Sequence, residues 1–324
     1  MKHLLDFEKP ISDLQHKLSE LREHTEGTEL KVDFDDEIRR MEEEIDKKRS
    51  EIYANLTAWQ RVQLARHPKR PYALDYISRS FSGFSELHGD RLFDDDRAIV
   101  AGFARLGDQK VMVIGTQKGR DTKENIMRNF GCAHPEGYRK AIRLMGLANR
   151  FGLPIITLID TAGAYPGVAA EERHIAKAIA INLREMSLFS VPMIALVIGE
   201  GGSGGALGIG VCDRVLIMEN AYYSVISPEG CASILWKDRS AAPQAAEALK
   251  ITSHDLLELG LVDEVVPEPL GGAHHDHETV AGTVKDTLIR QLKELQTIDP
   301  EERLRQRYQK FRNIGKFIEN PAAA

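Results

Sequence analysis

Residues Met193-Ile-Ala-Leu-Val-Ile-Gly-Glu-Gly-Gly-Ser-Gly-Gly-Ala206 join an apolar run to a stretch rich in glycine. Pro192 precedes the run, and six apolar residues without alternation predict a strand over 193–198 that is buried on both faces. Because glycine has no Cβ, we expect a sharply turning loop from Gly199 that leaves backbone N–H groups open to an anionic oxygen. A short helix to about Val211 should follow. This segment predicts an oxyanion-binding loop between a buried strand and a helix.

The flanking sequence alternates strand and helix patterns, which indicates an α/β core. Two β-rich runs, 97–106 and 110–117, are separated by Gly107-Asp108-Gln109 and predict an antiparallel hairpin. We expect a helix that starts at Pro135 and stops at Gly152, then a strand over 155–159, then one helix over about 171–186. Further strands are expected over 214–218 and 222–226, and further helices over 241–249, 253–259 and 278–295.

Residues 1–70 predict an N-terminal helical arm. Ile38, Ile45 and Ile52 recur every seven residues, a coiled-coil-like stripe of about two heptads that is too short to stand alone. It must therefore pack on the body of the protein or on a partner. We place the body at residues 71–315, with helices at its C-terminal end, and a tail at 316–324.

Composition excludes several classes of protein. A formal net charge of −6 argues against nucleic-acid binding. The three cysteines, Cys132, Cys212 and Cys231, form no C-x-x-C pair, so this chain carries no zinc ribbon and no disulfide framework is indicated. No apolar run reaches the roughly 18 residues of a membrane-spanning helix. We expect a soluble cytoplasmic protein with no membrane contact.

Some charged groups have a simple interpretation as solvated segments, although each could bind an anion or a metal. The basic ones are Arg61, Arg66, Lys69 and Arg70 in one group and Lys118, Arg120 and Lys123 in another. A third group, His274, His275 and His277, has some character of a metal site, but we expect no metal in this chain.

The glycine segment satisfies two common motifs, each weakly. Gly199-x-Gly201-x-x-Gly204, with Glu219 downstream, fits a dinucleotide-binding fingerprint, but the following helix is too short and too rich in glycine. Gly201-x-Ser203-x-Gly205 fits the nucleophile elbow of a serine hydrolase. That motif needs a histidine base held by an acid, and neither His254 nor the histidines at 274–277 follow a predicted strand convincingly.

A third pattern uses more of the sequence. The register Gly199-x-x-x-x-Gly204-Gly205, ending at Cys212-Asp213, resembles the oxyanion-hole segment of the crotonase superfamily. Pro228-Glu229 resembles the site of one hydratase carboxylate in that superfamily, but the position of the second carboxylate is Gly208. Hydration needs paired carboxylates, so an acyl-CoA hydratase or isomerase stays only an alternative, beside the serine hydrolase.

Five blocks together resemble the carboxyltransferase alpha subunit of bacterial and plastid acetyl-CoA carboxylase. They are Gly115-Thr-Gln-Lys-Gly-Arg120, Asn129-Phe-Gly-Cys-Ala-His-Pro-Glu-Gly137, Ile159-Asp-Thr-Ala-Gly-Ala-Tyr-Pro-Gly167, Gly199-Glu-Gly-Gly-Ser-Gly-Gly-Ala206 and Ser224-Val-Ile-Ser-Pro-Glu-Gly230. The resemblance runs from the helical arm to about residue 315. It implies a crotonase-like core, a ββα superhelix.

The resemblance also implies a reaction and its participants. The carboxyl group of carboxybiotin, held on a separate biotin carboxyl carrier protein, would pass to acetyl-CoA and form malonyl-CoA for fatty-acid biosynthesis. The backbone N–H groups of Gly204 and Gly205 would hold the biotin oxyanion, with Gly163, Ala164, Tyr165 and Ser203 lining the biotin pocket. A beta subunit with a zinc ribbon would complete the site in an α2β2 assembly, alongside biotin carboxylase. We expect activity only with that beta subunit, because this chain offers one glycine cradle for two oxyanions.

Overall fold

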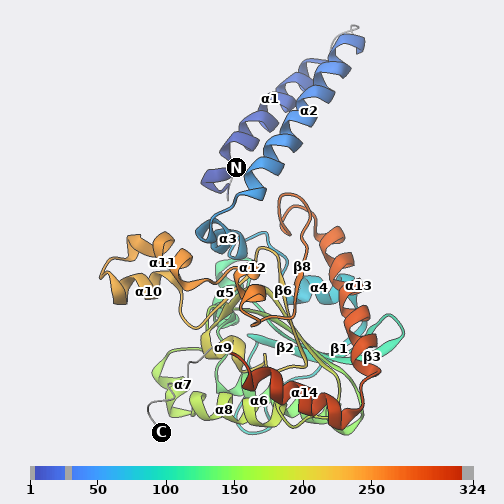
Figure 1. The fold of residues 1–324 in the computed structure, drawn as a ribbon, viewed down its shortest axis with the longest axis vertical. Coiled ribbons are helices and arrows are strands. Elements are labelled where there is room, and N and C mark those ends of the chain that lie inside the picture. Colours follow the sequence, from blue (N-terminus) through green and yellow to red (C-terminus); the bar gives the residue numbers. More distant parts are fainter. Residues whose placement is uncertain (1–3, 26–30, 316–324) are drawn as a thin grey trace, which may run out of the picture.

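The computed structural model describes residues 4–25 and 31–315, which form a body from which a helical arm projects (Figure 1). The body is built on one eight-stranded sheet with the strand order β1-β2-β3-β4-β5-β6-β8, and β7 pairs with β5. The strands are β1 Ser82–Glu86, β2 Ile99–Leu106, β3 Gln109–Thr116, β4 Ile155–Thr161, β5 Met193–Gly202, β6 Arg214–Met218, β7 Tyr222–Ser224 and β8 Glu264–Val266.

The expected hairpin is present, since β2 and β3 pair antiparallel from Ile99↔Thr116 to Leu106↔Gln109. From β3 onward all pairings are parallel. β5 is the longest strand, and its first half pairs with β6 while Glu200 to Gly202 pair with β7. The carboxyl ends of β3, β4 and β5 therefore lie together at one edge of the sheet.

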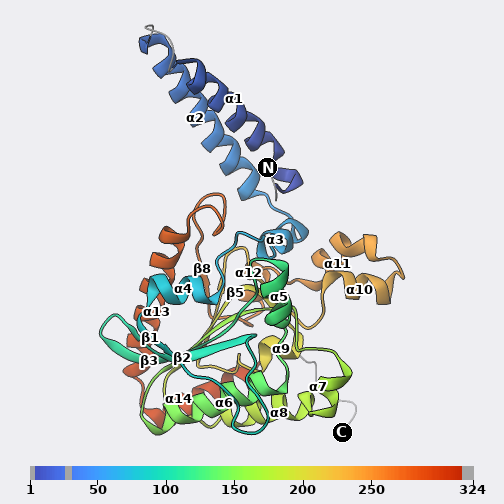
Figure 2. The same ribbon diagram turned by 180° about the vertical axis from the view of Figure 1, so that it is seen from behind.

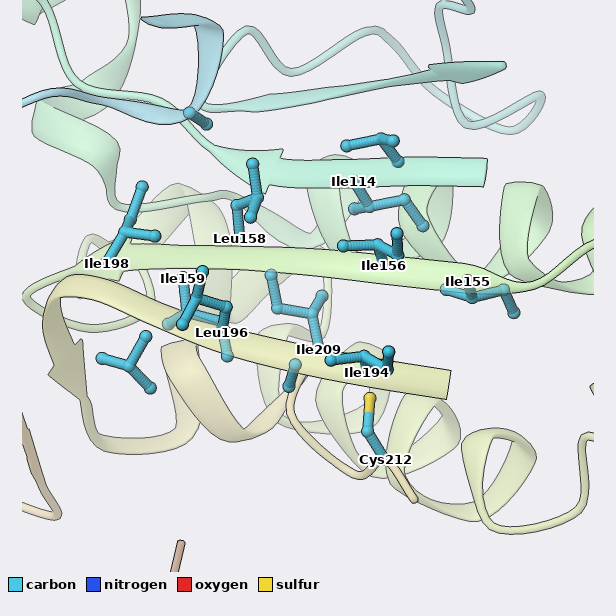
Figure 3. Packing of buried hydrophobic residues seen from close by; sticks show 14 of the residues in the cluster. Ile114, Ile155, Ile156, Leu158, Ile159, Ile194, Leu196, Ile198, Ile209 and Cys212 are labelled. Atoms are coloured by element: carbon cyan, nitrogen blue, oxygen red, sulfur yellow. The ribbon is translucent and has the colours of Figure 1, made fainter. Parts of the chain in front are cut away.

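The predicted apolar run of β5 lies at the centre of the core. Every residue of β5 is buried, and so is every residue of β4. Figure 3 shows isoleucine and leucine side chains of the two strands within one buried cluster, with Ile209 and Cys212 beside them. A central parallel strand needs apolar side chains on both faces, which explains why neither strand alternates.

Helices cover both faces of the sheet (Figures 1 and 2). α6 (Pro135–Arg150), α8 (Ile175–Met186) and α14 (Pro300–Arg312) lie on one side, and α4 (Ala73–Ser80) and α13 (His277–Gln296) lie on the other. The other helices after residue 70 are α5 Thr122–Met127, η2 Asn129–Gly131, α7 Val168–Glu172, α9 Ser203–Leu207, α10 Pro228–Leu235, η3 Arg239–Ala241, α11 Ala242–Leu249 and α12 Ser253–Glu258. No helix in the described ranges is both long and apolar enough to cross a lipid bilayer.

The prediction of a single helix over about 171–186 is wrong, because the structure has two separate helices there, α7 and α8. α7 ends at Glu172, and His174, which precedes α8, adopts a left-handed backbone conformation with φ 63°. The preceding Arg173 donates from Nε to Glu136 Oε1 on α6 at 2.6 Å, so the break is held by an ion pair that sequence periodicity does not reveal. α10 and α14 were not predicted.

The arm consists of η1 (Asp6–Glu8), α1 (Lys9–Thr25) and α2 (Lys31–Ala54). The seven-residue stripe of α2 packs against α1, where Ile45 is buried beside Ile11 and Leu18. The two long helices therefore cover each other, and Figure 1 shows them pointing away from the body. α3 (Ala58–Ala65) instead contacts the body, with Val62 and Ala65 beside Tyr222. The arm boundary at residue 70 stays a prediction.

Asp213, which follows the glycine segment and its short helix, ties α14 to the sheet. Its Oδ1 accepts a hydrogen bond from Arg307 Nε at 2.8 Å, and its Oδ2 accepts one from the backbone N–H of Met193 at 2.8 Å. The side chains of Arg307 and Asp213 are 1% and 2% exposed. Removing one partner of such a pair leaves an uncompensated buried charge.

We therefore expect Arg307→Ala to lower the free energy of unfolding by about 3–5 kcal/mol. The matched control is Arg305→Ala on the same helix, whose exposed ion pair with Glu302 should contribute less than about 1 kcal/mol. Urea unfolding followed by circular dichroism measures both. Equal effects of the two substitutions on the free energy of unfolding would show that the buried Asp213 carboxylate does not need Arg307 as its partner.

Candidate active site

The glycine segment is a strand for its first four residues, which corrects the loop expected from Gly199. β5 continues to Gly202 because β4 and β7 pair with it there. A Cβ on Gly202 would lie 2.1 Å from the carbonyl oxygen of Ala162, and one on Gly199 would lie 2.6 Å from Asp160 Oδ1. These glycines therefore allow backbones to approach closely, and the turn itself is confined to Ser203.

The turn opens α9 and leaves adjacent N–H groups without partners. Ser203 has φ 52°, a left-handed conformation, and Gly202 provides no side-chain cap. Among the described residues no acceptor is found for the backbone N–H groups of Gly204 and Gly205. The first N–H groups of a helix have no partner within the helix, so an external oxygen can accept from both.

The predicted residues Gly163 and Ala164 lie directly against this turn, and Tyr165 follows them in the chain. A Cβ on Gly205 would be 2.4 Å from the carbonyl carbon of Gly163 and 2.5 Å from the backbone nitrogen of Ala164. Tyr165 donates its N–H to Ala133 O at 3.0 Å, and its ring stacks on His134 with centroids 4.0 Å apart. The structure thus brings together the two blocks that the sequence analysis singled out.

An apolar groove of about 370 Å³ begins at Ser203 and Gly204. Its walls come mostly from the end of the glycine segment, β7 and the C-terminal helices. Apart from Ser203 and Gly204 they include Leu207, Tyr223, Val225, Leu256, Phe311 and Ile314. The groove can hold a flat apolar group next to Gly204.

A buried charge network lies at the carboxyl ends of three neighbouring strands. Lys118 follows β3, Asp160 lies near the end of β4, and Glu200 lies near the end of β5. The Lys118 Nζ is 2.6 Å from Asp160 Oδ1 and 2.7 Å from Glu200 Oε2. Arg66 Nε donates to Glu200 Oε1 at 2.7 Å, and Tyr222 Oη donates to the same oxygen at 2.6 Å.

The network keeps the Glu200 carboxylate ionised. Burial alone would raise the pKa of Glu200, but the nearby Lys118 and Arg66 cations outweigh burial and lower it to about 2. Burial by itself would lower the pKa of Lys118, and the two carboxylates raise it instead. The lowered pKa makes Glu200 a weak base near neutral pH, and Asp160 is engaged by Lys118.

The expectation that Arg66 and Lys118 lie in solvated segments is wrong, because both side chains belong to the buried charge network. Arg70 is also fully buried and pairs with Glu268. The sequence did contain a signal that was missed. Lys118, Asp160 and Glu200 each follow or end an apolar strand, and the carboxyl ends of parallel strands meet at one edge of a sheet.

Comparison with known proteins decides the family. A family model described as acetyl co-enzyme A carboxylase carboxyltransferase-like matches residues 4–315. Acetyl-coenzyme A carboxylase carboxyl transferase subunit alpha of Geobacter metallireducens is 56% identical over 319 residues, which cover 98% of this chain and 99% of that protein. The protein of the same name from Thermus thermophilus is 56% identical over 315 residues, 97% of this chain and 99% of that one.

This chain belongs to the acetyl-CoA carboxylase carboxyltransferase alpha-subunit family. Carboxyl transfer to acetyl-CoA is the function of this family, and fatty-acid biosynthesis follows from it. The resemblance drawn from the sequence blocks is confirmed, and the chain is a carboxyltransferase subunit, a transferase.

Solved structures confirm the fold. Transcarboxylase 12S, with methylmalonyl-coenzyme A and methylmalonic acid bound, aligns with a TM-score of 0.57 at 19% identity over 70% of this chain and 42% of that chain. The beta subunit of Pseudomonas aeruginosa geranyl-CoA carboxylase aligns with a TM-score of 0.52 at 18% identity over 71% and 44%. This chain spans less than half of either protein. Both are crotonase-fold carboxyltransferases, as the expected crotonase-like core requires.

The rival interpretations of the glycine segment find no support in the geometry of this alpha-subunit family member. No hydrogen bond joins Ser203 to any histidine in the part of the chain that the structure describes, and His274 and His275 contact Glu8 at the base of the arm instead. Glu229, the one hydratase-like carboxylate, pairs with Arg66. At Gly208 a Cβ would lie 2.7 Å from the ring of Tyr138, so no second carboxylate fits there.

We expect Lys118→Met to destabilise the chain in a pH-dependent way. Glu200 has its ordinary pKa of 4.5 in the unfolded chain and about 2 in the folded chain, so its contribution to stability is present above pH 4.5 and lost as the pH falls towards 2. Without Lys118 the pKa of Glu200 rises, and the loss of stability relative to wild type should be larger at about pH 7 than at about pH 3.

Thermal unfolding at both pH values measures this difference. Lys123→Met is the control, because Lys123 is exposed on α5 and should behave as wild type. A loss that does not change with pH would contradict the assigned role of Lys118.

Proposed function

We propose that this chain supplies the biotin side of the carboxyltransferase site, with the backbone N–H groups of Gly204 and Gly205 donating to the ureido oxygen of biotin. One observation carries the proposal: these adjacent N–H groups find no acceptor among the described residues, and an apolar groove begins beside them at Ser203 and Gly204. Both features suit biotin, whose polar oxygen projects from a largely apolar bicyclic ring. Gly163, Ala164 and Tyr165 frame the same turn, and Ser203 lines the groove.

In the proposed carboxyl transfer, the main contribution of this chain is the pair of backbone N–H donors. Carboxybiotin, when bound, supplies the carboxyl group that is transferred. The Gly204 and Gly205 N–H groups stabilise negative charge as it develops on the oxygen they hold, and each such donor typically contributes about 2.7–4 kcal/mol. The nearby carboxylates Asp160, Glu200 and Glu229 are engaged by Lys118 and Arg66, which accords with a reaction that uses no protein carboxylate as base.

A partner should supply the second oxyanion site, for the thioester of acetyl-CoA. The relatives are named as alpha subunits, and we propose a zinc-ribbon beta subunit in an α2β2 assembly, served by the biotin carboxyl carrier protein and biotin carboxylase. Exposed apolar side chains suit such a contact. Val225, beside the groove, is 82% exposed, and Ile234 and Leu235 on the projecting α10 are 69% and 64% exposed.

We also propose that the chain works in the cytoplasm, as its family function in fatty-acid biosynthesis suggests. The body at residues 71–315 would be the carboxyltransferase domain. Cys132, Cys212 and Cys231 are free thiols, which suits a reducing compartment.

The subunit requirement has a direct test. Malonyl-CoA formation from acetyl-CoA and carboxybiotin is measured with this chain alone and with a beta subunit added. We expect activity only in the mixture, because one cradle cannot hold both oxyanions. Full activity from this chain alone would overturn the two-subunit proposal.

The glycine cradle is tested by a matched pair of substitutions in the assembled complex. A Cβ on Gly205 would displace the Gly163–Ala164 backbone, whereas a Cβ on Gly204 meets only Ile179 Cδ1 at 3.6 Å. We expect Gly205→Ala to lower kcat by about 10²–10³, the usual effect of losing one oxyanion donor. Gly204→Ala should keep most activity because its N–H group remains in place.

Ser203→Ala distinguishes the backbone mechanism from serine hydrolysis. We expect it to keep most carboxyltransferase activity, since the backbone and not the hydroxyl binds the oxygen. Loss of activity in this variant, together with labelling of the wild type by a fluorophosphonate probe, would favour a serine nucleophile instead.

A further inference from the structure

Three potential metal ligands meet where the arm joins the body, far from the glycine cradle. Glu8 ends η1, and His274 and His275 follow the glycine pair Gly271-Gly272 in the loop before α13. Figure 1 shows this loop rising beside the base of the arm. One ligand atom from each residue lies within 4.8 Å of the other two.

The spacing of these atoms matches a coordination shell. Glu8 Oε1 is 3.5 Å from His274 Nε2 and 3.8 Å from His275 Nε2. Zinc bound tetrahedrally at 2.0–2.2 Å places neighbouring nitrogen and oxygen ligands about 3.4 Å apart. At 3.5–3.8 Å the donors are too far apart for ordinary hydrogen bonds, but small shifts would allow all three to bind one ion.

The cluster is buried and its members are held in place. The side chains of Glu8 and His274 are 8% and 4% exposed, whereas His275 is 45% exposed and opens the site to solvent. Tyr53 Oη donates to Glu8 Oε1 at 2.6 Å, and the Leu5 N–H donates to Glu8 Oε2 at 3.1 Å. A hydrogen bond of this kind orients a metal-binding carboxylate.

The glycine pair makes room for the two imidazoles. Gly271 and Gly272 have φ 97° and 87°, a region that side chains rarely adopt. A Cβ on Gly271 would lie 2.9 Å from His275 Cδ2, and one on Gly272 would lie 3.2 Å from His274 Nδ1. That Nδ1 is buried and finds no hydrogen-bond partner among the described residues. The nearby cations Arg49 and Arg70 are paired with Asp46 and Glu268.

We propose that Glu8, His274 and His275 form a zinc-class metal site that fastens the base of the helical arm to the body. Two imidazoles and one carboxylate favour zinc or a neighbouring transition metal over magnesium or calcium. A water molecule reaching the ion past the half-exposed His275 completes four ligands. The site joins residues far apart in the sequence and so fixes where the arm projects. It departs from our expectation that this chain carries no metal.

Zinc binding to the full chain tests the proposal. The purified chain is stripped with a chelator, dialysed and titrated with Zn²⁺ in a calorimeter. We expect one saturable site per chain, at least about 100-fold weaker in His275→Ala and lost in Glu8→Gln. His254→Ala, which removes an exposed histidine on α12, is the matched control and should bind as wild type. Circular dichroism verifies that each variant is folded.

Two further measurements do not depend on enzymatic activity. Co²⁺ should give the visible absorption of a tetrahedral ion in the wild type but not in Glu8→Gln, and Tyr53→Phe should weaken zinc binding about 10–100-fold. Zinc should raise the thermal midpoint of the wild type and of His254→Ala only. Absence of saturable zinc binding by the wild type, or equal binding by wild type and Glu8→Gln, would overturn the site and leave a hydrogen-bonded cluster without metal.

Discussion

The close approach of two backbones at the end of β5 is the constraint on which the site depends. Ala162 O lies where a Cβ of Gly202 would be, and the Gly163–Ala164 backbone lies where a Cβ of Gly205 would be. Any side chain at these positions would separate β4 from the turn into α9. Because the two backbones touch, the turn is held rigidly and the adjacent N–H groups keep one direction. Preorganised donors of this kind stabilise charge without reorganising during the reaction.

The charge network holds together the strand ends that carry the glycine turn. Asp160 Oδ1 accepts from the backbone N–H of Glu200 at 2.9 Å and from Lys118 Nζ at 2.6 Å, so one carboxylate joins three strand ends. Buried carboxylates are costly unless they are paired and hydrogen-bonded. Here the pairing connects strands β3, β4 and β5 at the edge where the site lies. We interpret the network as positioning machinery and not as acid-base machinery.

The arm and the body each have a hydrophobic core of their own. The hairpin of α1 and α2 buries Ile11, Leu18 and Ile45 between its own helices, so it needs no apolar surface from the body. Its attachment is polar at Glu8, which contacts His274 and His275, and apolar at the following helix α3, whose Val62 packs on the body. Polar contacts are directional, so they fix the orientation of the arm relative to the body as well as attaching it, which suits an arm that projects from the molecule.

The sequence by itself determined the hairpin of β2 and β3, the buried strands β4 and β5, and the family, because these depend on local periodicity and on blocks of neighbouring residues. Through the family resemblance it also pointed to Gly204 and Gly205, and at Gly205 the reason for glycine is the close approach of the Gly163–Ala164 backbone. Only the tertiary structure decided the partners of Lys118 and Arg66, the break at His174, and the meeting of Glu8 with His274. Each of these depends on side chains distant in sequence, and a local pattern carries no information about which charge will face another across the fold.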